Sequence, residues 1–231
     1  MLTLTSPLSS AALPHCCPLE PGLPAPPAPA QQLSVLGGAT DFAFSPHGDC
    51  LTLVTYYGAV CQLFPKTGDV LTVQQVGVDP RVQPLGVQNH YVVADADGRL
   101  RRSDVAPPAG EAPVAVHGDR VWGLAVSPAG RQALTAGLDE TVLLWDLDRL
   151  APLYCFRWFD ESYSGALAFS PDGTRALVGW EAGVQLLDVE HRRIVGPVDP
   201  DLKGIHSVEF APNGVQLFIG AADTRYSDGM L

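Results

Sequence analysis

The sequence predicts an all-β fold that is built from one structural unit repeated along the chain. Its 231 residues include 23 glycines and 21 prolines, which is typical of many turns and short strands rather than long helices. Four apolar stretches each end in a Pro-x-Gly turn, and their prolines are Pro46, Pro128, Pro171 and Pro212. These prolines are separated by 82, 43 and 41 residues. Because 82 is twice 41, we expect another unit, without this turn, between the first two.

Each unit is expected to repeat the same order of strands and turns. In the third unit an alternating strand leads into the turn at residues 127–130, and two apolar strands follow at 133–137 and 141–145. A polar linker with a weak fourth strand completes the unit. Proline presets the backbone of the turn, and glycine accepts its left-handed position. The unit without the Pro-x-Gly turn lies at residues 91–100, which predict two strands around an Asp-Gly turn.

A single four-stranded unit cannot bury both of its faces, so the units are expected to stack. The repeated region is predicted to span residues 33–231, enough for four to five units. Their approximate bounds are 37–78, 79–116, 117–159, 160–203 and 204–231, with the last unit truncated. Residues 1–32 hold a dense run of prolines and are predicted to be a disordered Pro-rich N-terminal segment. The segment 32–36 is a candidate outer strand for a missing unit.

The third unit has three further marks along its full length. His117 stands four residues before an apolar strand start, residues 127–130 form a Ser-Pro-x-Gly turn, and the unit ends in Trp145-Asp146. With these residues it resembles a repeat of the WD-repeat (WD40) family. The resemblance implies a β-propeller of four-stranded blades, of which a typical member has about seven. With four to five blades, this propeller is expected to be incomplete or open.

The same resemblance implies a hydrogen-bonded chain of side chains that locks the blade. It assigns this structural tetrad to His117, Thr135, Asp139 and Trp145. The assignment makes chemical sense, since a buried histidine and aspartate need partners and tryptophan offers one N–H donor.

The other units depart from this pattern. Leu187 stands in the tryptophan place of the fourth unit, and Asp160 lies near its histidine place. The first unit ends in Leu63-Phe64 and the second in Arg102-Ser103-Asp104, while the fifth keeps the aspartate as Asp223. These blades are expected to depend on apolar packing more than on a polar chain.

Charge, hydropathy and cysteine content narrow the classes of partner. The net charge of −11 disfavours direct binding of nucleic acid, because an acidic chain repels phosphate, and the basic run at residues 99–102 more often decorates a strand edge. No apolar stretch reaches the roughly 18 residues that span a bilayer, so no membrane insertion is expected. The five cysteines lack metal or redox spacing, and Cys50 and Cys61 are not expected to face each other in their hairpin. The expected localisation is the cytoplasm, with the nucleus as the alternative.

The sequence contains no motif that indicates catalysis. It has neither a Gly-rich phosphate loop nor a Gly-x-Ser-x-Gly elbow, and its six histidines show no metal-ligand spacing. No cofactor and no metal ion are therefore expected. His117 and Asp139 could form a catalytic pair, but both fit the blade-locking chain better.

We therefore expect a non-catalytic scaffold or adaptor that binds other proteins. Two alternatives stay open, namely a propeller-fold hydrolase with its site in the central channel and a truncated fragment of a larger scaffold. The open blade edges also predict self-association, since apolar faces and unpaired strands drive it.

Partner contacts in the WD40 family often come from residues beside the first strand and just before the turn aspartate. This resemblance assigns Arg120, Trp122 and Leu138 in the third unit, with Tyr56, Tyr163, Trp180 and His206 as approximate equivalents elsewhere. We expect these side chains to cluster on one face near the channel. The alternative is that Trp122 and Trp180 pack between blades.

A second candidate contact is the segment 156–163, which combines four aromatics with Arg157. Such a mixture is typical of interface hot spots, and it adds Trp158 to the candidate partner-binding residues. The alternative is that Phe156 and Trp158 belong to the weak outer strand and are half-buried there.

Overall fold

The computed structural model describes residues 3–5, 32–34, 38–85, 90–104, 117–157, 165–199 and 201–221. The chain divides into two units, Met1–Gly38 and Ala39–Leu231. In the first unit, β1 (Thr3–Thr5) and β2 (Gln32–Ser34) form a two-stranded antiparallel sheet. The described part of the segment 32–36 thus pairs with β1, and its assignment as an outer strand for a missing blade stays a prediction. The rest of the Pro-rich segment lies outside the described residues.

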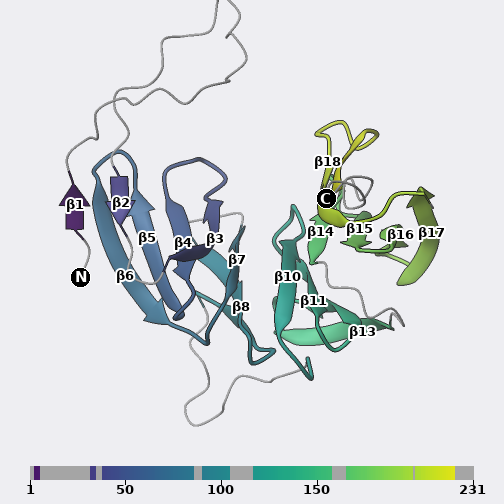
Figure 1. The fold of residues 1–231 in the computed structure, drawn as a ribbon, viewed down its shortest axis with the longest axis horizontal. Coiled ribbons are helices and arrows are strands. Elements are labelled where there is room, and N and C mark those ends of the chain that lie inside the picture. The colour runs from purple at the N-terminus through teal and green to yellow at the C-terminus, as the bar shows by residue number, and fades with distance from the viewer. Residues whose placement is uncertain are drawn as a thin grey trace, which may run out of the picture. The chain divides into compact units, whose positions relative to one another are not determined.

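The second unit is a series of antiparallel sheets, and its described residues contain no helix (Figure 1). We call each sheet a blade and number the blades in chain order. Blade one consists of β3 (Ala39–Phe44), β4 (Leu51–Thr55), β5 (Ala59–Phe64) and β6 (Asp69–Gln75). The described part of blade two consists of β7 (Arg81–Leu85), β8 (His90–Ala94) and β9 (Leu100–Arg102).

Blades three and four are four-stranded like blade one. Blade three consists of β10 (Val121–Val126), β11 (Gln132–Gly137), β12 (Thr141–Asp146) and β13 (Ala151–Arg157). Blade four consists of β14 (Ala166–Phe169), β15 (Arg175–Trp180), β16 (Gly183–Asp188) and β17 (Arg193–Asp199). The described part of blade five is the hairpin of β18 (Ile205–Phe210) and β19 (Leu217–Ala221). The predicted all-β fold of stacked blades is confirmed.

Successive blades contact each other through their first strands. β3 lies beside β7, β7 beside β10, β10 beside β14, and β14 beside β18. The described strands show no comparable packing of β18 against β3, so the series does not close into a ring. The expectation of an open arrangement is confirmed for this part of the chain. No helix among the described residues has the length and apolar character to cross a membrane.

The strand register shows which residues occupy equivalent places in the blades. Trp145 pairs with Ala133 in blade three, and Leu187 pairs with Ala176 in blade four, so Leu187 does stand in the tryptophan place. In blade one Leu63 holds this place opposite Leu51. The same register pairs Cys61 with Leu53, which leaves Cys50 beyond the Leu51–Leu63 pair and away from Cys61.

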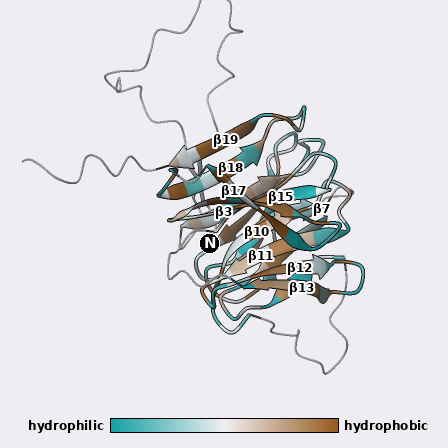
Figure 2. Ribbon diagram, turned by 90° about the vertical axis from the view of Figure 1, so that its right-hand side faces the viewer, coloured by the Kyte–Doolittle hydropathy of each residue, from teal (hydrophilic) through white to brown (hydrophobic). Residues whose placement is uncertain are grey.

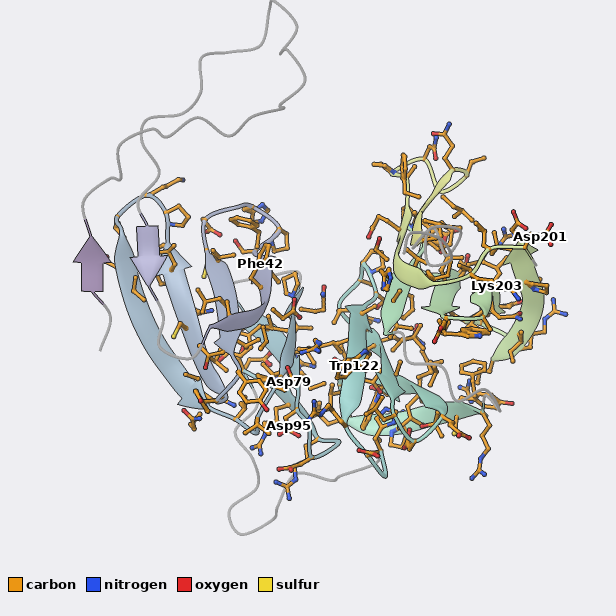
Figure 3. The ribbon with its side chains drawn as sticks, in the orientation of Figure 1. Phe42, Asp79, Asp95, Trp122, Asp201 and Lys203 are labelled. Atoms are coloured by element: carbon orange, nitrogen blue, oxygen red, sulfur yellow. The ribbon has the colours of Figure 1, made fainter. Side chains whose placement is uncertain are left out.

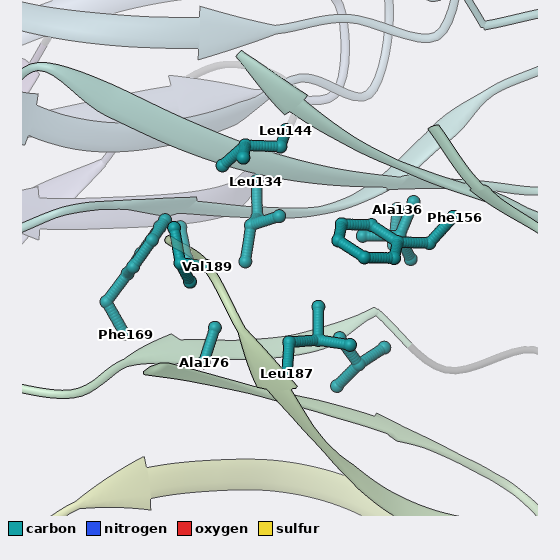
Figure 4. Packing of buried hydrophobic residues seen from close by; sticks show 11 residues of the cluster. Leu134, Ala136, Leu144, Phe156, Phe169, Ala176, Leu187 and Val189 are labelled. Carbon is teal, nitrogen blue, oxygen red and sulfur yellow. The ribbon is translucent and has the colours of Figure 1, made fainter. Parts of the chain in front are cut away.

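Apolar residues gather between the blades and hydrophilic ones in the turns (Figure 2). The cluster between blades three and four is seen from close by in Figure 4, where Leu134 and Leu144 of blade three face Ala176 and Leu187 of blade four. Full burial of one leucine side chain stabilises the fold by about 1.5–3 kcal/mol. The stacking of blades therefore supplies most of the core. The eleven members of this cluster are Ala125, Leu134, Ala136, Val142, Leu144, Phe156, Phe169, Ala176, Val178, Leu187 and Val189.

The two end blades each expose aromatic side chains. On β3, Ala43 packs toward blade two, whereas Phe42 and Phe44 point to the opposite face and are 62% and 54% exposed. On β19, Leu217 and Ile219 pack toward blade four, while Phe218 between them is 63% exposed. The alternation of a strand thus places large apolar side chains on the face that no described blade covers.

Candidate functional site

Four side chains of blade three form a continuous hydrogen-bonded chain. His117 precedes β10, Thr135 lies on β11, Asp139 lies in the turn after β11, and Trp145 lies on β12. His117 Nδ1 is 3.0 Å from Asp139 Oδ1, and His117 Nε2 is 2.6 Å from Thr135 Oγ1. Trp145 Nε1 donates to Thr135 Oγ1 over 2.8 Å. The structure therefore brings together all four residues of the expected tetrad.

The hydrogen-bond network assigns the protons of this chain. The Trp145 indole can only donate, so the Thr135 oxygen accepts its proton and the Thr135 hydroxyl donates to His117 Nε2. His117 Nδ1 then carries the proton that is donated to Asp139. Thr135, Trp145 and the His117 side chain are at most 1% exposed, and each polar atom has a partner, which a buried polar group requires.

Thr141 extends the chain beyond the expected four residues. Its hydroxyl donates to Asp139 Oδ1 over 2.7 Å, and its oxygen lies 3.0 Å from His117 Nδ1. The Gly118 N–H donates to Asp139 Oδ2 over 2.7 Å. Sequence reasoning missed Thr141, although a hydroxyl residue two positions after a turn aspartate is a recognisable signal.

Opposing effects act on the Asp139 carboxyl. Burial favours its neutral form, but the hydrogen bonds from His117, Thr141 and the Gly118 N–H outweigh burial and lower the pKa of Asp139 to about 2. The carboxylate is therefore ionised at neutral pH and anchors one end of the chain.

Gly137 provides the space that this chain needs. A Cβ atom added at Gly137 would lie within 2.5 Å of Asp139 Oδ1 and closer still to His117 Nδ1. Gly137 stands four residues after Ala133, and in blade four Trp180 stands four residues after the equivalent Ala176. Blade four therefore has no room for the same polar chain at this point.

Two of the expected partner-binding residues, Arg120 and Trp122, lie in a second cluster, which we call the Trp122 cluster (Figure 3). It consists of Asp79, Arg81, Arg120 and Trp122. The guanidinium carbons of Arg81 and Arg120 lie 5.4 Å and 5.8 Å from the Trp122 ring centroid, within the range of cation–π attraction. Arg81 Nε also donates to the Trp122 carbonyl over 3.2 Å.

Asp79 holds both arginines in place. Its Oδ1 is 3.0 Å from Arg81 Nη1, and its Oδ2 is 3.1 Å from Arg120 Nη1. The residue is 7% exposed and adopts a φ of 45°, an uncommon conformation for a residue other than glycine. Sequence reasoning missed Asp79 and Arg81, because neither stands in a motif and the two arginines come from different blades.

Backbone hydrogen bonds attach two more candidates to the Trp122 cluster. The Asp79 N–H donates to the Tyr56 carbonyl over 2.8 Å, and the Leu138 N–H donates to the Arg120 carbonyl over 2.9 Å. Tyr56 is 45% exposed and its neighbour Tyr57 is 66% exposed, with their rings edge to face at 5.5 Å. Tyr56, Arg120, Trp122 and Leu138 are thus linked across blades one to three.

The remaining candidates do not join this cluster. Trp180 is half-buried against the core between blades three and four, as the packing alternative expected, and His206 is exposed on β18. Phe156 is 4% exposed inside the same core, which agrees with the alternative that it belongs to the outer strand and is buried there. Trp158 and Tyr163 lie outside the described residues. The described residues hold no group of three or more His, Cys, Asp or Glu that could bind a metal ion.

Comparison with known protein families matches one segment of blade three and the residues before it. Residues 113–146 match the family model described as "WD domain, G-beta repeat". The chain carries a WD40 repeat. The match ends at Asp146, directly after the Trp145 that closes the hydrogen-bonded chain, and the resemblance inferred from the sequence is confirmed.

Curated relatives are similar to larger parts of the chain. Echinoderm microtubule-associated protein-like 3 of Mus musculus is 33% identical over 142 residues, 60% of this chain and 15% of that protein. The 77 kDa echinoderm microtubule-associated protein of Lytechinus variegatus is 32% identical over 48% of this chain and 16% of its own length. Small ribosomal subunit protein RACK1z of Arabidopsis thaliana is 37% identical over 39% of this chain and 27% of its own length. The chain thus matches less than a third of each of these relatives.

Proposed function

We propose that this chain is a non-catalytic platform that binds another protein through the Trp122 cluster and the adjoining Tyr56 and Tyr57. The observation that carries the proposal is the stack of Arg81 and Arg120 on Trp122, tied down by the buried carboxylate of Asp79. Tryptophan, tyrosine and arginine are the residue types that dominate binding energy at interfaces.

The arrangement favours a contact surface over a purely structural role. Arg120 is 34% exposed at its side chain, and Tyr56 and Tyr57 are more exposed still, so a partner can reach them. Side chains already held in one conformation lose less entropy when a partner binds, which increases affinity.

The geometry around His117 argues against a catalytic role for the His117–Asp139 pair. Its side chain is fully buried, and both ring nitrogens already contact groups of blade three. A general base must reach the proton that it removes from a substrate, and His117 cannot do so without breaking the chain.

The names of the relatives suggest which partner to test first. Two of them are called microtubule-associated and another is called a small ribosomal subunit protein. We therefore propose a microtubule protein as the first partner, with a protein of the small ribosomal subunit as the second. Both assemblies lie in the cytoplasm, which is the compartment that we propose for this chain.

Co-sedimentation with assembled microtubules tests the proposal, with small ribosomal subunits as a parallel arm. We expect Trp122→Ala to lower the pelleted fraction by about tenfold, since loss of a hot-spot side chain costs more than about 1.4 kcal/mol. Tyr154→Ala is the matched control, because Tyr154 is a 43% exposed aromatic on β13 outside the cluster. Equal pelleting of the wild type and Trp122→Ala would show that the cluster is not the contact surface. If the wild type pelleted with neither assembly, both proposed partners would be refuted.

We also propose self-association through the exposed faces of the end blades. Phe42, Phe44 and Phe218 supply the apolar surface that drives such contacts. Light scattering after size-exclusion chromatography should show oligomers that dissociate in the variant Phe42→Ser/Phe44→Ser. A monodisperse wild-type monomer over the tested concentrations would contradict this proposal.

A further inference from the structure

The blades of this chain stack in one sense, with equivalent strand positions at each contact. We call the side of a blade toward the preceding blade its front face, and the side toward the following blade its back face. Leu124 is the third residue after Val121, the first paired residue of β10, and it packs against blade two from the front face of blade three. Val208 is likewise the third residue after Ile205 on β18, and it packs against blade four from the front face of blade five.

Phe42 occupies this front-face position in blade one. It is the third residue after Ala39, the first paired residue of β3, and β3 has the same bulge after its first pair as β10 and β18. Phe44 lies two residues further along the strand and therefore points to the same face. Because no described blade precedes blade one, the two side chains are 62% and 54% exposed. The described residues thus leave this front face without a back face to cover it.

Phe218 occupies a back-face position in blade five. It pairs with Glu209 across β18 and β19. The equivalent pair in blade three is Leu134 with Ala125, and both pack against blade four. Leu134 is 0% exposed there, whereas Phe218 is 63% exposed because no described blade follows blade five. Glu209 is exposed on the same face as Phe218, since directly opposite residues of paired strands point to one face.

The two uncovered faces are of opposite kinds, so a second copy can repeat the stacking that is found within the chain. A contact of blade five with blade five would instead bring two Glu209 carboxylates into one interface, where like charges repel. A contact of blade one with blade one would pair two front faces, which no described blades do.

We propose that the back face of blade five in one copy docks on the front face of blade one in a second copy, with Phe218 packed against Phe42 and Phe44. Such a contact is heterologous, because each copy contributes a different face. The proposal rests on the self-association proposed above and names the two faces that meet.

Two variants that each lack one face test the proposal by light scattering after size-exclusion chromatography. Phe42→Ser/Phe44→Ser removes the front-face rings, and Phe218→Ser removes the back-face ring. Each variant alone should stay monomeric at about ten times the concentration at which the wild type associates, since loss of an interface hot spot weakens binding at least about tenfold. An equimolar mixture should form a dimer with one copy of each variant, because each keeps the face that the other has lost.

Tyr154→Ser is the matched control for the loss of an exposed aromatic. Tyr154 lies on β13 of blade three, away from both end blades, and this variant should associate like the wild type. A dimer in the mixture also shows that both single-face variants are folded. Thermal denaturation of each variant is followed in parallel, and threonine, which suits strands, replaces serine in any variant that does not unfold like the wild type.

The possible outcomes separate this proposal from the self-association on which it rests. A wild type that stays monomeric at all tested concentrations overturns both. If the wild type associates and either single-face variant alone associates equally well, the contact does not need both faces and only the head-to-tail arrangement is refuted. Two monomeric variants that form no dimer when mixed refute it as well.

Discussion

Blades three and four share one backbone register but stabilise their centres by different chemistry. In blade three Trp145 lies opposite Ala133, and Thr135 stands two residues after Ala133. Both belong to the polar chain. In blade four the equivalent places hold Leu187 and Val178, both buried among apolar neighbours. The same four-stranded sheet forms in both cases, so the polar chain is not required for a blade to fold.

The two blades differ together at three positions, those of the threonine, the tryptophan and the glycine. Blade three combines His117, Thr135, Asp139 and Trp145 with a small residue, Gly137, that leaves them room. Blade four replaces the threonine, the tryptophan and the glycine together. A partly formed polar chain would leave buried donors or acceptors unpaired, which costs about 1–3 kcal/mol for each group. We infer that a blade must contain either the complete chain or an apolar centre.

The largest expected effect is that of truncating the central side chain of each blade. Trp145→Ala should lower the free energy of unfolding by about 3–5 kcal/mol, because it creates a cavity and removes the donor to Thr135. Leu187→Ala should lower it by about 2–4 kcal/mol, since only packing is lost. Urea denaturation of both variants measures the difference, and a smaller loss for Trp145→Ala than for Leu187→Ala would contradict this view of blade three.

A pair of nearly isosteric exchanges tests the comparison more directly. Thr135→Val leaves His117 Nε2 and the Trp145 N–H without their partner, and we expect it to destabilise by about 2–3 kcal/mol. Val178→Thr buries a hydroxyl in an apolar centre and should cost about 1–2 kcal/mol. Both exchanges therefore destabilise although they run in opposite directions. If either one proved neutral by thermal denaturation, the centre of that blade would not discriminate between polar and apolar side chains.

The smallest effect concerns pH. Asp139 has a pKa of about 2 in the folded chain against an ordinary value of 3.8, so its ionisation stabilises the fold above about pH 4. This contribution is lost as the pH falls through the folded pKa. The difference in unfolding free energy between the wild type and Asp139→Asn should therefore shrink by on the order of 1 kcal/mol between about pH 5 and 2.

Other acidic groups titrate in the same window but cancel from that difference. The pKa of Asp172 is lowered to about 2 by hydrogen bonds from Ser170 and Thr174, and that of Asp188 is lowered to about 2 by the His191 N–H and side chain. Both are present in the wild type and in Asp139→Asn. A difference that stays constant over the whole pH range would show that Asp139 is not held as an ion by its neighbours.

Local pattern was enough to predict the strands and turns of blade three, and the resemblance of this segment to a WD40 repeat was enough to predict its tetrad. Strands, turns and the spacing of His117, Thr135, Asp139 and Trp145 all lie within one continuous segment, and the polar chain closes inside one sheet. The Trp122 cluster could not be predicted in the same way. Arg81 and Arg120 belong to different blades, and Asp79 joins them only because the first strands of blades two and three lie side by side.

The segment around Phe156 is a second case in which local pattern did not predict a contact between blades. Its aromatics favour an interface when the sequence is considered alone. In the structure Phe156 pairs opposite Val142 and is part of the core between blades three and four. Whether an aromatic on an outer strand is buried depends on the neighbouring blade, which the local pattern does not contain.

The sequence by itself determined the all-β class and the order of strands in each blade, because these depend on turn chemistry and on contacts within one repeat. The resemblance of one repeat to the WD40 family added the tetrad of blade three. Only the tertiary structure decided which residues meet across blades. The Trp122 cluster and the exposed face of Phe42 and Phe44 both arise from the stacking of sheets. The buried area of each sheet face depends on which neighbouring sheet packs against it. That is a non-local property, which strand periodicity does not encode.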